Sequence, residues 1–350
     1  MRKGIPKLLG CCGVLLLVGC AQRDLQYETI RNVQYIKKER VIDYRDLTVP
    51  EESGVRFTQF SGEIDVLMSP YIENKEGIIV WETDSKLDVS PDGQNVAYIG
   101  FGNGKSNIYI KSLVGGRTTI QRTFKESIVN VAYSRDGKNL VYTDKNDTDK
   151  NIYQIDAAQG AAVQQITSTN QIETSPIYSH DNKQIYFTKG EYSSTYSTYR
   201  YYIWSFDKTT SIVSQYCEGF SPCMSSDGKT LYFTRNNKES GLGEIWSLSL
   251  ATGQETQILA DPERGFSTPK VSPNGQILLV TGSSLASPNR YENLDLYTIK
   301  TDGTNLTQLT FHPGHDLSGV WSPSGDDIYF LSQRGNEKGN YGIWSIKYKK

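Results

Sequence analysis

Few residues in this chain have the types and spacing that catalysis requires. Two of the three histidines, His312 and His315, form a His-x-x-His pair around Pro313-Gly314. Such a pair can bind a metal ion, but no cluster of acidic residues or cysteines accompanies it. We therefore expect the pair to lie in a loop at a binding surface, with no metal or other cofactor.

The sequence also lacks the motifs of covalent and phosphate chemistry. It contains no Gly-x-Ser-x-Gly turn and no glycine-rich phosphate loop. Its 37 basic and 39 acidic residues nearly cancel, which gives a net charge of −2. Because no basic stripe is present, nucleic acid and anionic membrane surfaces are unfavourable partners.

Residues 1–20 have the pattern of a targeting segment. A basic start precedes an apolar run, Leu8 to Val18, which is too short to cross a bilayer core of about 30 Å as a helix. The run ends at Leu17-Val18-Gly19-Cys20, which resembles the bacterial lipoprotein signal. The resemblance implies that Cys20 is acylated, with chains such as palmitate, and becomes the first mature residue. An ordinary signal peptide and a core segment are the alternatives.

Acylation at Cys20 would make this a lipid-anchored protein of the bacterial envelope, because several acyl chains anchor durably. Ala21 rather than Asp follows the cysteine, which in well-studied Gram-negative families indicates the outer membrane, facing the periplasm. Residues 21–54 are polar, mixed in charge and free of repeats, so we expect a tether that is partly helical. A partner-binding arm is the alternative for this segment.

The later part of the chain is organised by a sequence repeat, whose first copy begins at Ser90-Pro91-Asp92-Gly93. The motif and the apolar strand after it recur at intervals of about 44 to 50 residues, the range of a four-stranded propeller blade. The other copies begin at Ser134, Ser179, Ser225, Ser272 and Ser322. The Asp-Gly or Asn-Gly step suits a tight hairpin turn.

Two columns of apolar residues, six and eight positions after each serine, indicate one face of a strand. These columns are Val96, Leu140, Ile185, Leu231, Leu278 and Ile328, and Tyr98, Tyr142, Phe187, Phe233, Val280 and Phe330. A third strand carries an aromatic residue after Ile or Leu, and a fourth strand follows in most copies. One such sheet cannot bury both faces alone, so the copies must pack against one another.

The last copy ends at Lys350 directly after its third strand, so we predict that residues 55–60 complete it and close the ring. The predicted fold is an all-β, six-bladed β-propeller over residues 55–350. A strand-like segment at Gly77–Glu82 leaves a seventh blade as the alternative. Cys217 and Cys223 lie on the crossing between two blades, and a disulfide forms only if that crossing folds back.

Insertions between the second and third strands distinguish two copies from the rest. Strands alternate direction, so these loops share one face with the channel mouth, opposite the Asp-Gly turns. Function on repeat proteins collects where insertions do, and Tyr, Ser and Arg suit adaptable binding surfaces. The candidate binding residues in the insertions are Tyr192, Tyr196, Tyr199, Arg200, Arg290 and Tyr291. The alternative is a pair of solvated loops.

The repeat resembles that of the TolB family over about residues 85–350. The resemblance rests on Ser-Pro-Asp-Gly followed by Asn107-Ile108-Tyr109, and on the stretch from Leu309-Thr310 through Gly314-His315-Asp316 to Trp321-Ser322-Pro323. It implies contacts with envelope proteins, including a peptidoglycan-associated lipoprotein. The chain departs from TolB in having a lipid site and too short a tether for the N-terminal α/β domain.

Together these observations predict a non-catalytic, envelope-anchored propeller that binds or scaffolds other envelope proteins. The first alternative is a carbohydrate- or peptide-processing enzyme, a lyase or hydrolase, with His312 and His315 at the channel mouth. The second alternative is a glycan-binding module that uses the tyrosine-rich insertion.

Overall fold

The structure is a computed structural model that describes three N-terminal strands and most of the chain after residue 84. The three strands are β1 (Tyr27–Ile30), β2 (Val33–Ile36) and β3 (Val55–Gln59). Between residues 85 and 348 the gaps are 103–104, 115–118, 124–126, 146–149, 159–161, 195–197, 288–289, 313–314 and 334–340. Within these residues no helix has the length and apolar character needed to cross a membrane.

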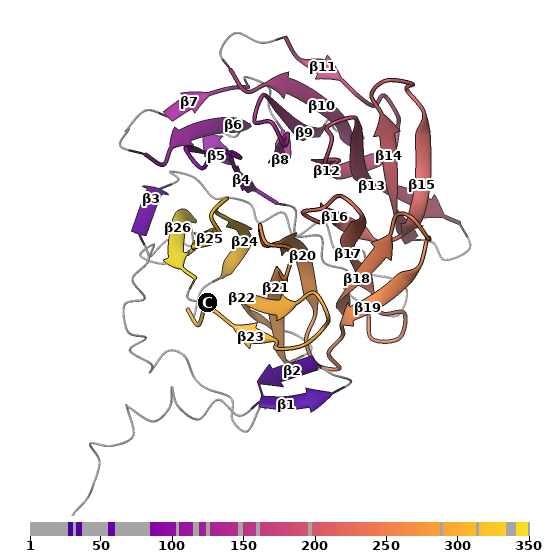
Figure 1. Cartoon of the computed structure of the whole chain (residues 1–350), viewed down its shortest axis with the longest axis vertical. Coiled ribbons are helices and arrows are strands. Elements are labelled where there is room, and N and C mark those ends of the chain that lie inside the picture. The colour runs from indigo at the N-terminus through magenta and orange to yellow at the C-terminus, as the bar shows by residue number, and fades with distance from the viewer. Residues whose placement is uncertain are drawn as a thin grey trace, which may run out of the picture.

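From β4 onward the strands form consecutive four-stranded antiparallel units around one axis, so the protein is an all-β propeller (Figure 1). The first three units comprise β4 (Leu87–Val89), β5 (Asn95–Gly102), β6 (Lys105–Ser112) and β7 (Thr119–Gln121); β8 (Ile128–Tyr133), β9 (Asn139–Lys145), β10 (Lys150–Asp156) and β11 (Gln164–Gln165); and β12 (Ile172–Tyr178), β13 (Gln184–Ser193), β14 (Thr198–Asp207) and β15 (Val213–Glu218). A single parallel bridge, Lys150 to Ile172, joins the second unit to the third.

The remaining described strands continue in the same order. They are β16 (Phe220–Met224), β17 (Thr230–Asn236), β18 (Gly243–Ser249) and β19 (Glu255–Leu259); β20 (Phe266–Val271), β21 (Ile277–Ser287), β22 (Arg290–Lys300) and β23 (Thr307–Gln308); and β24 (Asp316–Trp321), β25 (Asp327–Ser332) and β26 (Gly342–Lys347). The first strand of each unit lies nearest the axis and the last lies at the rim (Figure 1).

The sixth unit takes its outer strand from the N-terminal part of the chain. β3 pairs antiparallel with β26, with Val55 opposite Ser345 and Gln59 opposite Gly342. The first and sixth units then pack directly, because Leu87 of β4 lies in one apolar cluster with Leu317 of β24. The described strands thus form six units in a closed ring. Residues 60–84, where the sequence left room for a seventh blade, lie outside the described residues.

The apolar columns seen in the sequence form the contacts between units. All six residues of the first column, from Val96 to Ile328, have no exposed surface, and those of the second column, from Tyr98 to Phe330, are also buried. The Ile or Leu before each aromatic of the third strand is completely buried as well. Each such side chain contributes about 1.5–3 kcal/mol, and only when a neighbouring unit covers it.

The serine-aspartate turns are fixed by a hydrogen-bond pattern that repeats around the ring. In the fourth unit, Ser225 Oγ donates to Asp227 Oδ1 at 2.7 Å and accepts from the Thr230 N–H at 2.9 Å. The serine hydroxyl lowers the pKa of the motif aspartates Asp92, Asp136, Asp181 and Asp227. The turn therefore accounts for these aspartates without an acid–base role.

Each turn also lies against the turn of the preceding unit. A Cβ added at Gly93 would lie 3.5 Å from Pro323, one at Gly137 would lie 3.4 Å from Pro91, and one at Gly228 would lie 2.6 Å from His180 Cβ. In the third unit, where Asn182 replaces the glycine, its side chain accepts the Arg135 N–H at 2.8 Å. The Gly93 contact joins the first unit to the sixth, so the chain of turns closes on itself.

The described part of the segment expected to be a tether is a hairpin. β1 and β2 pair antiparallel, with Tyr27 opposite Ile36 and Ile30 opposite Val33. β2 lies against β23 at the rim of the fifth unit (Figure 1).

Candidate functional site

One position in or just before the innermost strand holds a polar residue in every unit. This position, four residues before each motif serine, holds Lys86, Asn130, Ser175, Ser221, Thr268 and Ser318. The last four have φ values of 50–54°, a left-handed conformation that is uncommon for residues with a side chain. A shift in strand register accompanies each of these four residues, so each is a β-bulge that re-aims its side chain.

Threonines of the preceding unit hold two of these bulges in place. Thr188 Oγ1 accepts the Ser221 N–H at 3.0 Å, and Thr234 Oγ1 accepts the Thr268 N–H at 3.2 Å. Both threonines are completely buried, so their hydroxyls satisfy backbone donors that water cannot reach. The strain at the channel is therefore supported by contacts between units.

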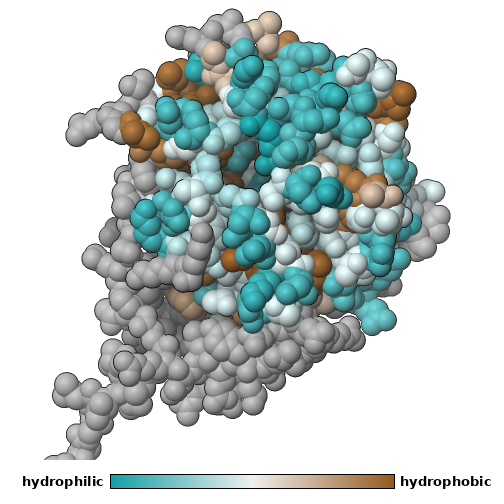
Figure 2. Space-filling model, in the orientation of Figure 1, coloured by the Kyte–Doolittle hydropathy of each residue, from teal (hydrophilic) through white to brown (hydrophobic). Residues whose placement is uncertain are grey.

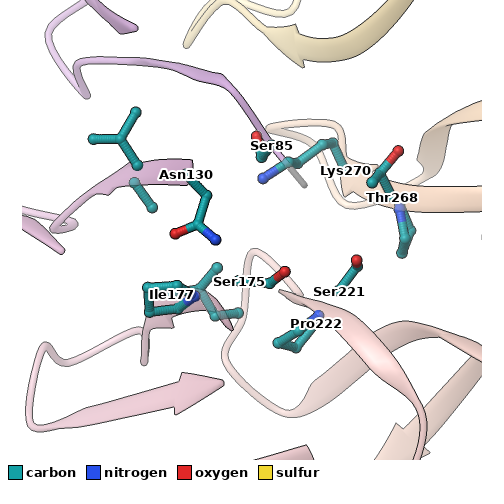
Figure 3. Close-up of a pocket in the computed structure, with 12 residues that line it drawn as sticks. Ser85, Asn130, Ser175, Ile177, Ser221, Pro222, Thr268 and Lys270 are labelled. Carbon is teal, nitrogen blue, oxygen red and sulfur yellow. The ribbon is translucent and has the colours of Figure 1, made fainter. Parts of the chain in front are cut away.

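A small cavity lies on the axis between the inner strands. Figure 3 shows Ser85, Asn130, Ser175, Ser221, Thr268 and Lys270 around it. Its volume of about 20 Å³ is enough to hold an ordered water molecule. Lys270 is the only charged residue that lines it. Around the central hollow, the face in Figure 2 is largely hydrophilic.

The charged groups near the axis are engaged with one another and with the backbone. Asp88 is buried and accepts the N–H of Tyr133 at 2.8 Å and that of Val89 at 3.1 Å. Burial raises the pKa of Asp88, and the nearby charges of Lys270 and Arg135 oppose that rise. Lys86 Nζ donates to the Val129 carbonyl at 2.6 Å. Both Asp88 and Lys86 thus join the first unit to the second.

The candidate tyrosines lie on a long hairpin of the third unit. β13 and β14 pair from Gln184–Asp207 to Ser193–Thr198, well beyond the reach of β15. Tyr192 is 61% exposed and Tyr199 is 38% exposed, and their rings meet edge to face at 5.5 Å. The structure thus brings these two together as an exposed aromatic pair. Tyr196 lies outside the described residues.

Arg200 is paired within the protein rather than free for a ligand. Its Nη2 lies 2.9 Å from Glu218 Oε2, its Nε donates to Glu218 Oε1 at 3.3 Å, and the guanidinium lies over the Tyr202 ring. The pair ties the hairpin to β15. Arg290 and Tyr291 lie on β22, opposite Ser287 and Leu285, at the end of the second long hairpin; the structure describes their backbone only.

The two histidines lie between β23 and β24. His315 Nδ1 accepts the Leu294 N–H at 3.1 Å, and burial lowers the pKa of its imidazole. His312 is half-buried. Among the described residues no group of three or more His, Cys, Asp or Glu side chains is placed to hold a metal ion. The Nδ1 atom of His315 thus contacts the backbone of β22, and its role as a binding residue stays a prediction.

Cys217 and Cys223 are free thiols in the structure, so the disulfide that the sequence left open is not formed. Cys217 lies on the outer strand β15 and packs between the third and fourth units. Cys223 lies on the inner strand β16, packs between the fourth and fifth units, and accepts the Val271 N–H at 3.3 Å. The crossing from rim to axis separates the two sulfurs. Cys20 lies outside the described residues.

Two features of the site were missed in the sequence. The first is the polar column, four of whose residues line the cavity on the axis; it is visible in the sequence, because all six positions hold Lys, Asn, Ser or Thr. The second feature is an apolar outer edge on the third unit, formed by Ile212, Val213 and Tyr216. Its signal is the absence of charge from residue 209 to residue 217.

Comparisons with known proteins agree on the fold. The model of the TolB beta propeller domain matches residues 85–287. A Tol-Pal system protein TolB of Francisella tularensis subsp. mediasiatica is 23% identical over 283 residues, which are 76% of this chain and 61% of that protein. The chain thus spans less than two thirds of the curated relatives it matches, 22% and 61% of two of them.

Two solved structures share the fold at low identity. A putative TolB from Agrobacterium tumefaciens has a TM-score of 0.54 and 18% identity, over 78% of this chain and 94% of that one. An oligogalacturonate lyase from Vibrio parahaemolyticus has a TM-score of 0.57 and 12% identity, over 87% of this chain and 95% of that one. Similarity at this level establishes the propeller and no activity.

Proposed function

Because the chain belongs to the TolB beta propeller domain family, we propose that it is a non-catalytic, lipid-anchored protein that binds other proteins of the cell envelope. The name of the Francisella relative, a Tol-Pal system protein, supports the envelope setting. The proposed partners are peptidoglycan-associated or outer-membrane proteins.

The exposed pair of Tyr192 and Tyr199 is the observation that carries this proposal. Exposed aromatic side chains on a protein surface are enriched at binding sites, because they bury a large area at a low cost in conformational entropy. The pair projects on a hairpin that extends beyond the neighbouring strand β15. A partner can therefore reach both rings without displacing the rest of the ring of units.

Preorganisation of this hairpin supports the same conclusion. The bidentate contact between Arg200 and Glu218 joins the hairpin to β15 next to Tyr199. A surface that is already ordered loses less entropy when a partner binds. The cavity on the axis, by contrast, is small and is lined by one charged residue, Lys270, among the described residues.

The lipid anchor is proposed from the sequence alone, through Leu17-Val18-Gly19-Cys20. The Cys20→Ser variant should move the protein from the membrane fraction to the soluble fraction and abolish incorporation of labelled palmitate. Retention of the label in this variant would contradict acylation at Cys20. An outer-membrane location is tested by separating inner and outer membranes on a density gradient.

The binding role is tested by cross-linking in intact cells, followed by purification of the full chain and identification of the captured proteins. The double variant Tyr192→Ala, Tyr199→Ala should lose specific envelope partners roughly tenfold or more, since a binding hot spot is worth about 2 kcal/mol. Thr256→Ala, an exposed position on β19, is the matched control. Unchanged capture by the double variant would overturn the proposal, and retention on immobilised glycans instead would favour the glycan-binding alternative.

A further inference from the structure

The outer strand of the third unit has an unusual edge. β15 stands at the end of its sheet in the part of the chain that is described, at the rim of the ring (Figure 1). Three large apolar side chains lie exposed on it or just before it: Ile212 is 60% exposed, Val213 44% and Tyr216 37%. Apart from Glu218 at its end, β15 has no charged residue and no proline, and an apolar edge strand is a template for pairing with another strand.

The fourth unit provides a matched comparison. Val213 pairs with Phe206 in the third unit as Glu255 pairs with Leu248 in the fourth, and both outer strands have a register shift two positions later. Val213 and Glu255 thus occupy equivalent positions. Glu255 is charged and lies 2.6 Å from Arg235. The equivalent of Tyr216 is Ile258, which is only 7% exposed.

We propose that β15 pairs antiparallel with β15 of a second copy of this chain, joining two propellers edge to edge. The resulting sheet would continue the third unit of one copy into the third unit of the other. This contact is separate from the Tyr192–Tyr199 surface, so the two proposals stand or fall independently.

The charge pattern of the strand favours a second copy as the occupant. Residues 209–217 carry no charged side chain, and the flanking charges are Lys208 and Glu218. An antiparallel pair related by a two-fold axis places the two Glu218 residues at opposite ends, so no like charges face each other. Arg200 already pairs with Glu218, so the strand offers no free charge to select an acidic or basic partner.

The interface would be small. Contacts below about 1,200 Å² are typical of weak, transient complexes, and a single pair of short strands falls in that class. The dimer should therefore dissociate readily in dilute solution and persist where copies are concentrated. Anchoring to one membrane surface, as proposed above, would supply that concentration.

Photo-cross-linking of the full chain in cells tests the pairing directly. A benzoylphenylalanine at position 216, in place of Tyr216, should give a product of twice the chain mass, with the new bond within residues 213–218 of a second copy. The same probe at Gln257 of β19 should give no such product. Cross-links from position 216 only to a different protein, or none at all, would overturn the proposal.

Introducing a charge on β15 then distinguishes strand pairing from chance proximity of two copies. Val213→Glu gives β15 the residue that β19 carries at this position, and it should lower the yield of dimer roughly tenfold or more. Thr256→Glu on β19 should leave the yield unchanged. Because Val213 is partly exposed, the variant should fold, which its melting temperature checks. An undiminished yield from folded Val213→Glu protein would contradict the proposal.

Discussion

At one end of the ring, short turns repeat the same hydrogen bonds, whereas at the other end the hairpins differ in length from unit to unit. In five of the six units described, the serine hydroxyl of the turn donates a hydrogen bond to the Asp or Asn side chain two residues later. The strands of these hairpins range from six residues each in β25–β26 to eleven each in β21–β22.

The difference follows from what the side chains at each end contact. A turn residue such as His180 lies against the next unit, where a Cβ at Gly228 would meet it. A change there disturbs two units at once. Tyr192 at the hairpin end contacts Tyr199 of its own unit and is otherwise exposed. Contacts between units therefore restrict the turns, whereas an exposed hairpin end such as that of Tyr192 can vary in length.

The largest effect should come from Gly228→Ala in the turn. Gly228 has a φ of 73°, and a Cβ there would lie 2.6 Å from His180 Cβ, so the variant should lose about 2–4 kcal/mol of unfolding free energy. Gly253→Ala is the control, because its φ is 70° and nothing lies within 4 Å of the added Cβ. Its loss should be about 1 kcal/mol. Equal losses in calorimetry would show that the contact between turns contributes nothing.

A smaller loss is expected from Thr234→Val beside the channel. This change leaves the buried Thr268 N–H without its acceptor, which costs about 1–3 kcal/mol. Thr143→Val is the control, since the buried Thr143 Oγ1 has no hydrogen-bond partner among the residues that the structure describes, and it should be neutral or slightly stabilising. Denaturant unfolding distinguishes the two variants, and a reversed order would contradict the role assigned to Thr234.

The Ser225→Ala variant should change how the stability of the protein depends on pH in the acid range. The serine hydroxyl holds the pKa of Asp227 below its ordinary value, so this bond contributes stability above about pH 4 that is lost as pH falls through the folded-state pKa. The variant should raise the pKa of Asp227 in an NMR titration and flatten the loss of stability below pH 4. Ser322→Ala, in the turn that has Ser324 instead of Asp, should leave that slope unchanged.

The smallest effect on stability is expected at the hairpin. Tyr192→Ala removes a side chain that is 61% exposed, so the unfolding free energy should change by less than about 0.5 kcal/mol. Its effect should appear in partner capture alone. A fall of several degrees in melting temperature would show that the hairpin is part of the fold rather than a surface displayed by it.

Much of the fold could be predicted because every repeat places apolar residues at the same positions, and these must be buried against a neighbouring unit. The column from Val96 to Ile328 recurs in every copy and is completely buried in every unit. The missing fourth strand of the last copy predicted a strand near residues 55–60, and β3 occupies that position beside β26. The candidate site was harder, because Arg200 and His315 look like free polar groups until their partners, Glu218 and Leu294, are placed beside them.

The sequence by itself determined the repeat, the turn chemistry and the alternation that makes each unit a sheet, because these depend on residues close together in the chain. Only the tertiary structure decided that Cys217 and Cys223 stay apart, that Ser221 and Thr268 are held in left-handed bulges at the channel, and that the edge of β15 is exposed. These features depend on which unit lies beside which, and on the distance from axis to rim. Neither can be read from spacing along the chain.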